Sequence, residues 1–263
     1  MRLLINIFLV LGLFSYSAIA TADLSDSSLA SKEEQKFAKE YLQRIHNKDF
    51  AFVKSKMDAE LQAKVTDETL SQLASFFPHG KVLSTELIGA QIDVVDSDWF
   101  GNFKFEYHYE AGWAVGHIAL KRKNDQLTVV GFSINKTKTS QKEINRFTFS
   151  GKSAIHYVTL IAAVCVFLFI LITLVVCMRT TMLKRKWLWA LFIVLGVSAI
   201  DVNWTTGEYA FQLIRFQLFG AAMVANSEYS PWIITASFPL GAIVFWFRRS
   251  RLVAFTNSSK QDV

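Results

Sequence analysis

Apolar and polar residues follow different patterns along this chain, and one stretch shows no alternation at all. Residues 157–178 (YVTLIAAVCVFLFILITLVVCM) contain no charged side chain and no polar stripe at the helical period. At about 1.5 Å per residue, a helix of this length extends about 33 Å, which is enough to cross the hydrocarbon core of a bilayer. The run therefore predicts a transmembrane helix, which we place at residues 153–178.

The segment after residue 30 carries apolar positions at helical spacing. Ser31 and Glu34 have the spacing of a capping box, in which each side chain binds the backbone N–H of the other residue. This helix is expected to continue to about Asn47, with a second helix starting at Asp49 and a third at Thr66. The sequence therefore predicts three helices before the first strand.

After residue 80 the period changes to two, as expected for half-buried β-strands. The predicted strands are residues 82–95, 99–110, 113–123 and 126–136. In the second strand the aromatic residues from Phe103 to Tyr109 share one face, and Lys104, Glu106 and His108 share the other. One buried face and one wet face indicate an antiparallel sheet. The predicted fold class is α+β, with three N-terminal helices packed on a curved four-stranded antiparallel meander.

The order of elements over residues 31–138 resembles the nuclear transport factor 2-like fold, a cone-shaped α+β roll. The segment KEEQKFAKEYLQRIHNKDFAFVKSKM, a helix followed by an N-K-D turn and a second helix, is similar to the start of small secreted bacterial members. Members of this fold range from enzymes that use an Asp/His pair inside the cone to binding or assembly modules. No such pair is recognisable in this sequence, so the resemblance implies a cone-type domain and favours binding or assembly.

The other segments are assigned from apolar runs and from the charges beside them. Two more transmembrane helices are predicted at residues 187–203 and 231–247, which gives an all-α three-helix transmembrane domain. Basic residues cluster in the loop 179–186 and at the start of the tail 248–263, which places both on the cytoplasmic side. The remaining parts are a cleaved signal peptide at 1–22, a mobile leader at 23–30 and a linker at 139–152.

Residues 204–230 allow two interpretations. The stretch 209–225 is apolar enough for a fourth span, but Arg215 would then lie in mid-membrane at a cost of about 2.5–3.5 kcal/mol. The pattern instead alternates up to Leu213 and again, after a one-residue slip, from Ile214 onward. We therefore predict an outer-face hairpin or interfacial element, and keep a helix as the alternative.

The net charge of +6 does not indicate nucleic-acid binding. Residues 23–152 contain 18 basic and 18 acidic side chains, and the excess lies in clusters that flank the apolar runs. We therefore exclude a nucleic-acid partner and expect contact with the lipid bilayer. The two cysteines, Cys165 and Cys177, lie in the first apolar run, and no metal-ligand spacing such as CxxC or HExxH occurs. No cofactor and no metal is expected.

Two groups of residues are candidates for chemistry. Asp201 is the acidic side chain nearest a predicted span, so it is a suspect for transport or proton transfer, although its place at the outer end favours a solvated role. The weak ligand-binding candidates are aromatic and histidine residues that could line the open end of the cone: Trp99, Tyr107, Tyr109, Trp113 and His117. No residue is predicted to be catalytic.

These features predict a non-enzymatic, multi-pass protein of a bacterial inner membrane, with its N-terminal domain periplasmic or extracellular and its C-terminus cytoplasmic. The secreted-side domain would bind a protein or small ligand as an accessory, sensor or assembly subunit. A partner membrane protein is expected, because the cytoplasmic tail is too short for a signalling domain. Two alternatives stay open: an enzyme that uses the cone pocket of residues 31–138, and a small transporter subunit built on residues 153–247.

Overall fold

The computed structural model describes residues 31–95, 98–123, 126–180 and 186–258. The chain divides into two compact units. Within the described ranges, the N-terminal unit comprises residues up to 146 together with 226–230, and the C-terminal unit comprises the rest. The predicted signal peptide, the predicted leader and residues 181–185 of the predicted basic loop lie outside the described residues.

The N-terminal unit begins with four helices, one more than predicted. They are α2 (Lys32–His46), α3 (Phe50–Ser55), α4 (Ala59–Lys64) and α5 (Asp67–Ser75). The capping box of Ser31 and Glu34 is present, and Asp49 and Thr66 accept from backbone N–H groups at the starts of α3 and α5. Asp58 caps the additional helix, α4, because its carboxylate accepts from two backbone N–H groups.

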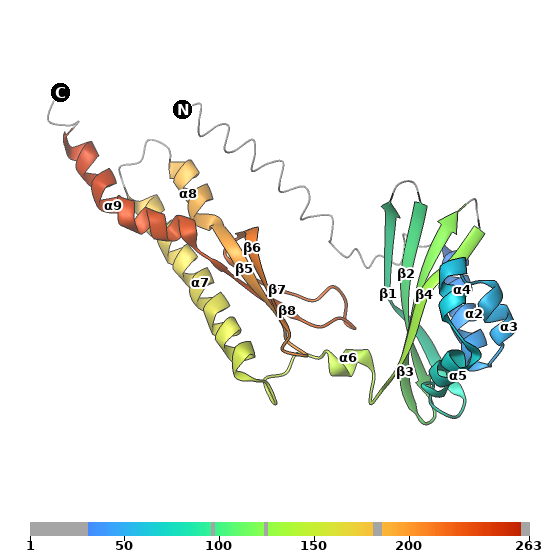
Figure 1. Cartoon of the computed structure of the whole chain (residues 1–263). Coiled ribbons are helices and arrows are strands. Elements are labelled where there is room, and N and C mark those ends of the chain that lie inside the picture. The colour runs from blue at the N-terminus through green and yellow to red at the C-terminus, as the bar shows by residue number, and fades with distance from the viewer. Residues whose placement is uncertain (1–30, 96–97, 124–125, 181–185, 259–263) are drawn as a thin grey trace. The chain divides into compact units, whose positions relative to one another are not determined.

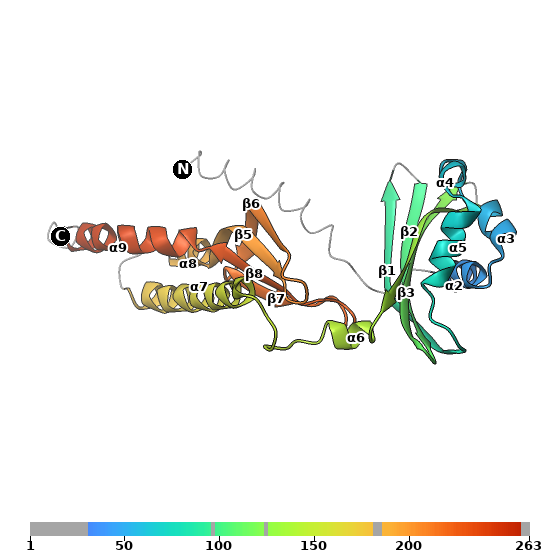
Figure 2. The ribbon, with the colours of Figure 1, turned by 60° about the horizontal axis from the view of Figure 1, so that its bottom comes forward.

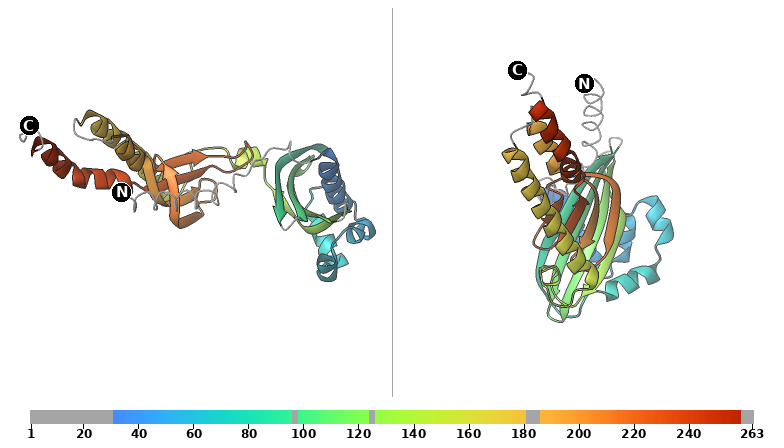
Figure 3. Two further views of the ribbon diagram at one scale, coloured as in Figure 1. Left: turned by 90° about the horizontal axis from the view of Figure 1, so that it is seen from above. Right: turned by 90° about the vertical axis from the view of Figure 1, so that its left-hand side faces the viewer.

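The four strands of the first sheet begin and end within one residue of the predicted ranges. They are β1 (Val82–Val95), β2 (Asp98–Tyr109), β3 (Gly112–Lys123) and β4 (Gln126–Thr137). Each strand pairs antiparallel with its neighbour in sequence. The helices α2 to α5 gather on one face of this sheet (Figure 1), and the sheet curls around α2 (Figure 3).

The core of the N-terminal unit lies between α2 and the sheet. The aromatic side chains of β2 from Phe103 to Tyr109 are buried with Leu42 and Ile45 of α2. Gly116 of β3 permits this close approach, because a Cβ atom there would lie 2.9 Å from Leu42 Cδ1. The helix and the curved sheet therefore share one continuous apolar interior.

The segment predicted as a linker contains a short helix, α6 (Gln141–Ile144), which Ser140 caps. The residues after α6 belong to the C-terminal unit from position 147 onward. There the indole N–H of Trp204 donates to the Thr148 carbonyl (2.8 Å), and Lys152 Nζ donates to the Trp204 carbonyl (2.6 Å). Both ends of the segment are thus bound to folded structure.

The C-terminal unit combines three helices with a second sheet. The described elements are α7 (Ala154–Arg179), α8 (Lys186–Val194), β5 (Leu195–Asn203), β6 (Tyr209–Leu218), β7 (Ala221–Val224), β8 (Ile233–Phe238) and α9 (Leu240–Ser258). The strand order is β6-β5-β8-β7, and all neighbouring strands are antiparallel. Helix α7 runs along this sheet (Figure 2), where Ala163 packs with Ile234 and Ala236 of β8.

The predicted fold class is wrong, because the second half of the chain is not an all-α domain. The structure is α+β with two four-stranded antiparallel sheets, and helices α6 to α9 follow or separate strands. The predicted span 187–203 is α8 followed by β5, and the predicted span 231–247 is β8 followed by the first part of α9. Short, continuously apolar runs carry no periodicity that separates a helix from a buried strand. With nine residues, α8 extends only about 14 Å.

Among the described helices, α7 alone has the length and the apolar composition needed to cross a bilayer. The prediction of three spanning helices is therefore replaced by one candidate span.

The predicted slip between Leu213 and Ile214 corresponds to an irregularity in β6. Val197 of β5 pairs with Phe216, whereas Ala199 pairs with Gln212, so several residues of β6 lie opposite one residue of β5. That residue of β5 is Ser198, which has φ 58° and whose hydroxyl donates to the Leu213 carbonyl (2.6 Å). Residues 209–218 form a strand, but its partner is β5, and the described β6 and β7 do not pair with each other.

Candidate functional site

The five predicted ligand-binding residues lie on both faces of the first sheet. Tyr107 and Tyr109 face the helices and belong to the core, and Trp99 packs against the edge of the same core. Trp113 and His117 lie on the opposite face, because they pair in register with His108 and Lys104. The structure therefore does not bring the five side chains to one pocket.

Packing contacts account for most of these aromatic side chains. Burial raises the pKa of Tyr109 to about 12 and raises that of Tyr107 still further. Trp113 stacks on the imidazole of His108, with ring centroids 3.9 Å apart. The Arg122 guanidinium lies over the Trp99 ring, 4.8 Å from its centroid. These residues stabilise the sheet on its two faces.

His117 lies on the outer face of the first sheet in a partly buried position. Burial lowers its pKa, and the nearby Lys104 ammonium lowers it further. Both effects favour the neutral imidazole. Within the described ranges, no group of three or more His, Cys, Asp or Glu side chains could hold a metal ion.

Asp201 forms a polar cluster on the second sheet. Its neighbour Ile200 packs towards α7, so Asp201 lies on the other face of β5. Arg215 Nη1 lies 2.6 Å from Asp201 Oδ2, and Gln212 donates to the same oxygen (3.2 Å). The Thr235 hydroxyl donates to Oδ1 (2.5 Å). The carboxylate is thus paired and hydrogen-bonded on both oxygens, and its side chain is only 15% exposed.

The Asp201 cluster joins three strands of the second sheet. Asp201 lies on β5, Arg215 on β6 and Thr235 on β8. This pairing explains how an arginine is accommodated in the apolar strand β6. It also leaves Asp201 with an ion-pair partner, which favours a structural role for this carboxylate.

Two carboxylates lie directly opposite each other on the first sheet. Glu86 of β1 is in register with Glu106 of β2, on the face opposite the helices. Glu106 is 3% exposed and accepts from the backbone N–H of Gln141 in α6 (2.5 Å). Burial raises the pKa of Glu106 and the Glu86 charge raises it further, while the Gln141 N–H and His108 oppose the shift. Apart from the wet face predicted for Glu106, no pattern in the sequence indicates this pair.

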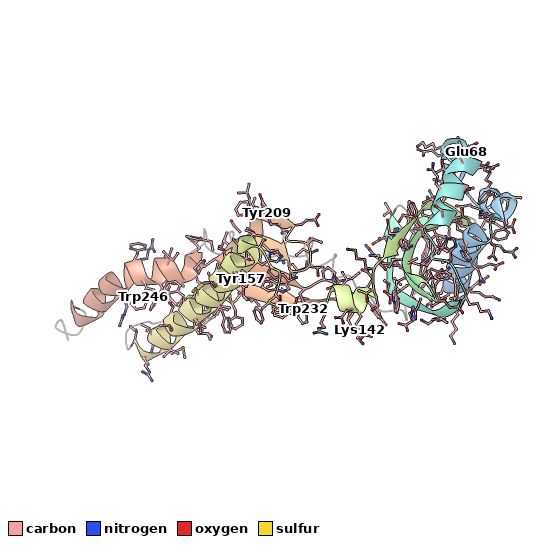
Figure 4. The ribbon with its side chains drawn as sticks, turned by 90° about the horizontal axis from the view of Figure 1, so that it is seen from below. Glu68, Lys142, Tyr157, Tyr209, Trp232 and Trp246 are labelled. Carbon is pink, nitrogen blue, oxygen red and sulfur yellow. The ribbon has the colours of Figure 1, made fainter. Side chains whose placement is uncertain are left out.

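Residues 226–230, which we call the docking segment, belong to the N-terminal unit and lie beside these carboxylates. The Tyr229 hydroxyl donates to Glu86 Oε2 (2.5 Å), and Asn145 Nδ2 donates to the Tyr229 carbonyl (2.7 Å). Lys142, which projects from α6 (Figure 4), pairs with Glu228 at 2.5 Å. In the chain, however, the docking segment joins β7 to β8 of the C-terminal unit.

The contacts of the docking segment change the acidity of its side chains. The hydrogen bond to Glu86 raises the pKa of Tyr229. The Lys142–Glu228 pair raises the pKa of Lys142 and lowers that of Glu228. The segment also has internal order, because the Ser227 hydroxyl accepts from the Tyr229 N–H (3.3 Å) and bonds to the Ser230 hydroxyl (2.9 Å). It is a defined turn held by polar contacts.

Comparison with known proteins adds no assignment to these sites. No family model, no curated protein and no solved structure matches the chain. The resemblance of residues 31–138 to the nuclear transport factor 2-like fold therefore stays a prediction.

Proposed function

We propose that this protein is a non-enzymatic, membrane-anchored coupling subunit of accessory or sensor type. Its N-terminal unit binds a protein or small ligand on the outer side of the membrane, and the docking segment carries the state of that unit to the C-terminal unit. One observation carries the proposal: residues 226–230 pack with the N-terminal unit, although β7 and β8 flank them in the chain.

The apolar surface of α7 supports anchoring in a bilayer. The large apolar side chains that α7 leaves more than half exposed include Val158, Ile161, Ile172 and Met178. Exposed apolar surface of this extent marks a membrane or partner contact in a folded protein. A helix of 26 residues extends about 39 Å, which exceeds the thickness of the hydrocarbon core.

Covalent continuity supports the coupling. Tyr229 lies four residues before Ile233, the first residue of β8. Strand β8 in turn contributes Thr235 to the Asp201 cluster and packs on α7. A ligand that favours the docked or the undocked state of residues 226–230 therefore shifts the ends of β7 and β8 with it. Coupling of this kind needs a difference in ligand affinity between the two states.

Hydrogen–deuterium exchange on the full chain in lipid nanodiscs tests the coupling. Tyr229→Phe removes the hydroxyl that donates to Glu86. We expect exchange in residues 226–230 to become roughly five-fold faster, as loss of one hydrogen bond predicts. We also expect a smaller increase in β8, with α2 and α5 unchanged. If the docking segment loses protection and β8 does not change, the coupling does not exist.

A matched control removes the same chemical group elsewhere. The Tyr157 hydroxyl donates to the Phe149 carbonyl within the C-terminal unit. Tyr157→Phe should therefore leave exchange in the docking segment at the wild-type rate. An equal response to both substitutions would mean that the exchange change reports general loosening of the protein.

A further inference from the structure

We propose that protons regulate the docking segment, and that the Glu86–Glu106 pair on the first sheet is the proton-binding site. This inference rests on the proposed function, because it names the regulation of the same contact. It stands on the position of two carboxylates on neighbouring strands, one of them buried, beside the residues that hold the segment.

The register places two like charges against each other. Side chains directly opposite on antiparallel strands have Cβ atoms about 4.5–5.5 Å apart, and like charges at this distance are destabilising. Glu106 is almost completely buried, so water screens its charge poorly. No basic side chain among the described residues lies within ion-pair distance of Glu106. One proton on the pair removes the repulsion.

The charged groups around Glu106 come from every element that packs near it. Glu86 faces it from β1, and His108 and Lys104 lie on the same face of β2, two residues away on either side. On β3 the opposite residue is Val115, with His117 opposite Lys104. The charged or titratable side chains contributed by α6 and the docking segment are Lys142, Glu143, Glu228 and Tyr229.

These surroundings leave Glu106 as the group most affected by a proton. Lys142 and Glu228 pair with each other, and both side chains are more than half exposed. Glu143 pairs with Arg146 at the surface. His108 stacks on Trp113 and only partly offsets the effects of burial and of Glu86.

Docking and protonation are linked through α6. The N–H of Gln141 contacts Glu106, and Asn145, directly after α6, holds the carbonyl of Tyr229. Release of the segment therefore frees α6 and exposes the buried Glu106 carboxylate to water, whereas Glu86 is exposed in the docked state as well. The pKa of Glu106 is raised in the docked state and returns towards its ordinary value of about 4.3 on release.

The direction of the pH effect follows from this difference. The docked state holds a proton more tightly than the released state, so docking strengthens as the pH falls through the raised pKa. Docking weakens as the pH rises above that value. The Lys142–Glu228 pair acts in the opposite direction and only in stronger acid, because the pKa of Glu228 is lowered. Docking is therefore tightest in mildly acidic solution.

Hydrogen–deuterium exchange of the full chain in nanodiscs tests this pH dependence of docking. Exchange is measured at about pH 5 and at about pH 8, and the rates are corrected for the intrinsic effect of pH on exchange. In the wild type, protection of residues 226–230 and 141–145 should rise on acidification, because the docked state, in which the pKa of Glu106 is raised, holds the proton more tightly. Glu106→Gln carries no charge at any pH, so its docking should be tight and independent of pH. Glu143→Gln, a surface change in the same helix, should keep the wild-type pH dependence.

The outcomes separate this inference from the proposed function. If wild-type protection is the same at both pH values, protons do not regulate the docking segment, although docking stands. If the segment is unprotected at every pH and Tyr229→Phe changes nothing, docking itself is absent. A pH dependence that disappears in His108→Gln but persists in Glu106→Gln would assign the proton to His108 and overturn the inference.

A second variant keeps the test decisive if Glu106→Gln does not fold. Glu86 is exposed, and Glu86→Gln removes the repulsion without changing a buried side chain. Its pH dependence should be weaker than that of the wild type but should persist, because burial of Glu106, the larger cause of its raised pKa, is unchanged. Circular dichroism should stay unchanged. A wild-type pH dependence in this variant would refute the pair as the proton-binding site.

Discussion

The two units bury their apolar side chains to different extents. In the N-terminal unit, one core cluster draws residues from α2, α3, α5 and all four strands. In the described part of the C-terminal unit the core divides into two smaller clusters, one around Ile170 and one around Trp204. Large apolar side chains such as Ile161 and Ile214 stay exposed there. The first unit is stabilised by its own burial, whereas the second leaves large apolar side chains of α7 and β6 exposed.

Polar side chains show the same contrast. On the face of the first sheet away from the core, the like charges of Glu86 and Glu106 lie opposite each other beside the docking segment. In the second sheet, Asp201 and Arg215 form an attractive pair, and the Thr235 hydroxyl donates to the same carboxylate. Repulsion between two carboxylates beside a docking contact can serve a switch, while an attractive pair fixes the strands in place. Substitutions in each unit test this division.

The largest effect is expected in the core of the N-terminal unit. Phe103 is fully buried, and Phe103→Ala should lower the free energy of unfolding of this unit by about 3–5 kcal/mol. Lys104→Ala, one residue further on the opposite face, should change it by less than about 0.5 kcal/mol. Pulse proteolysis of the full chain in denaturant measures both. Equal losses of unfolding free energy for the two variants would mean that Phe103 and Lys104 do not lie on a buried and an exposed face of β2.

A smaller effect is expected for the matched isoleucines of α7. Ile170 is fully buried against α8 and α9, whereas Ile161 is 62% exposed. Ile170→Ala should lower the free energy of unfolding by about 1–3 kcal/mol, because it leaves a cavity. The hydrophobic contribution of moving the side chain out of water does not apply to a helix that packs in lipid. Ile161→Ala should cost less than about 0.5 kcal/mol, because lipid fills the space that the side chain leaves. Reversible unfolding in mixed micelles measures both variants.

The opposite ranking of the two isoleucines would change the comparison between the units. A large loss at Ile161 would mean that a protein surface, and not lipid, covers this side of α7. The C-terminal unit would then be half of an interface, and its exposed apolar residues would be explained by a partner chain.

The first sheet was predictable because its strands carry polar markers. Phe103 and Lys104 alternate on opposite faces, so the strand and its phase can be read directly from the sequence. The second sheet lacks such markers at its start. The run from Trp187 to Val197 is uniformly apolar, so the change from α8 to β5 depends on tertiary packing that no local pattern reveals.

The carboxylate pair could not be predicted, even from correctly placed strands. Continuing the register of the Val95–Asp98 pair without interruption would place Glu106 opposite Leu87. A register shift between Leu87 and Gly89 moves the pairing by one residue, so that Glu106 meets Glu86. Likewise Asp201 was recognisable as unusual, but its partner Thr235 lies 34 residues away and was assigned to another element.

The smallest of these effects is expected at the Asp201 cluster. Asp201→Asn keeps the shape of the side chain and an oxygen that can accept from Thr235, but removes the charge that faces Arg215. Loss of one partner of a buried pair costs about 3–5 kcal/mol, and we expect about 1–2 kcal/mol here because the Arg215 side chain is 32% exposed. Arg215→Met should cost a similar amount.

The double variant should regain part of the loss, because neither charge is then left unpaired. Unfolding of the four proteins in mixed micelles gives the coupling energy between Asp201 and Arg215. A coupling energy near zero would show that the pair does not hold β6 against β5, and the contrast between an attractive pair in the second sheet and a repulsive pair in the first would lose its energetic basis.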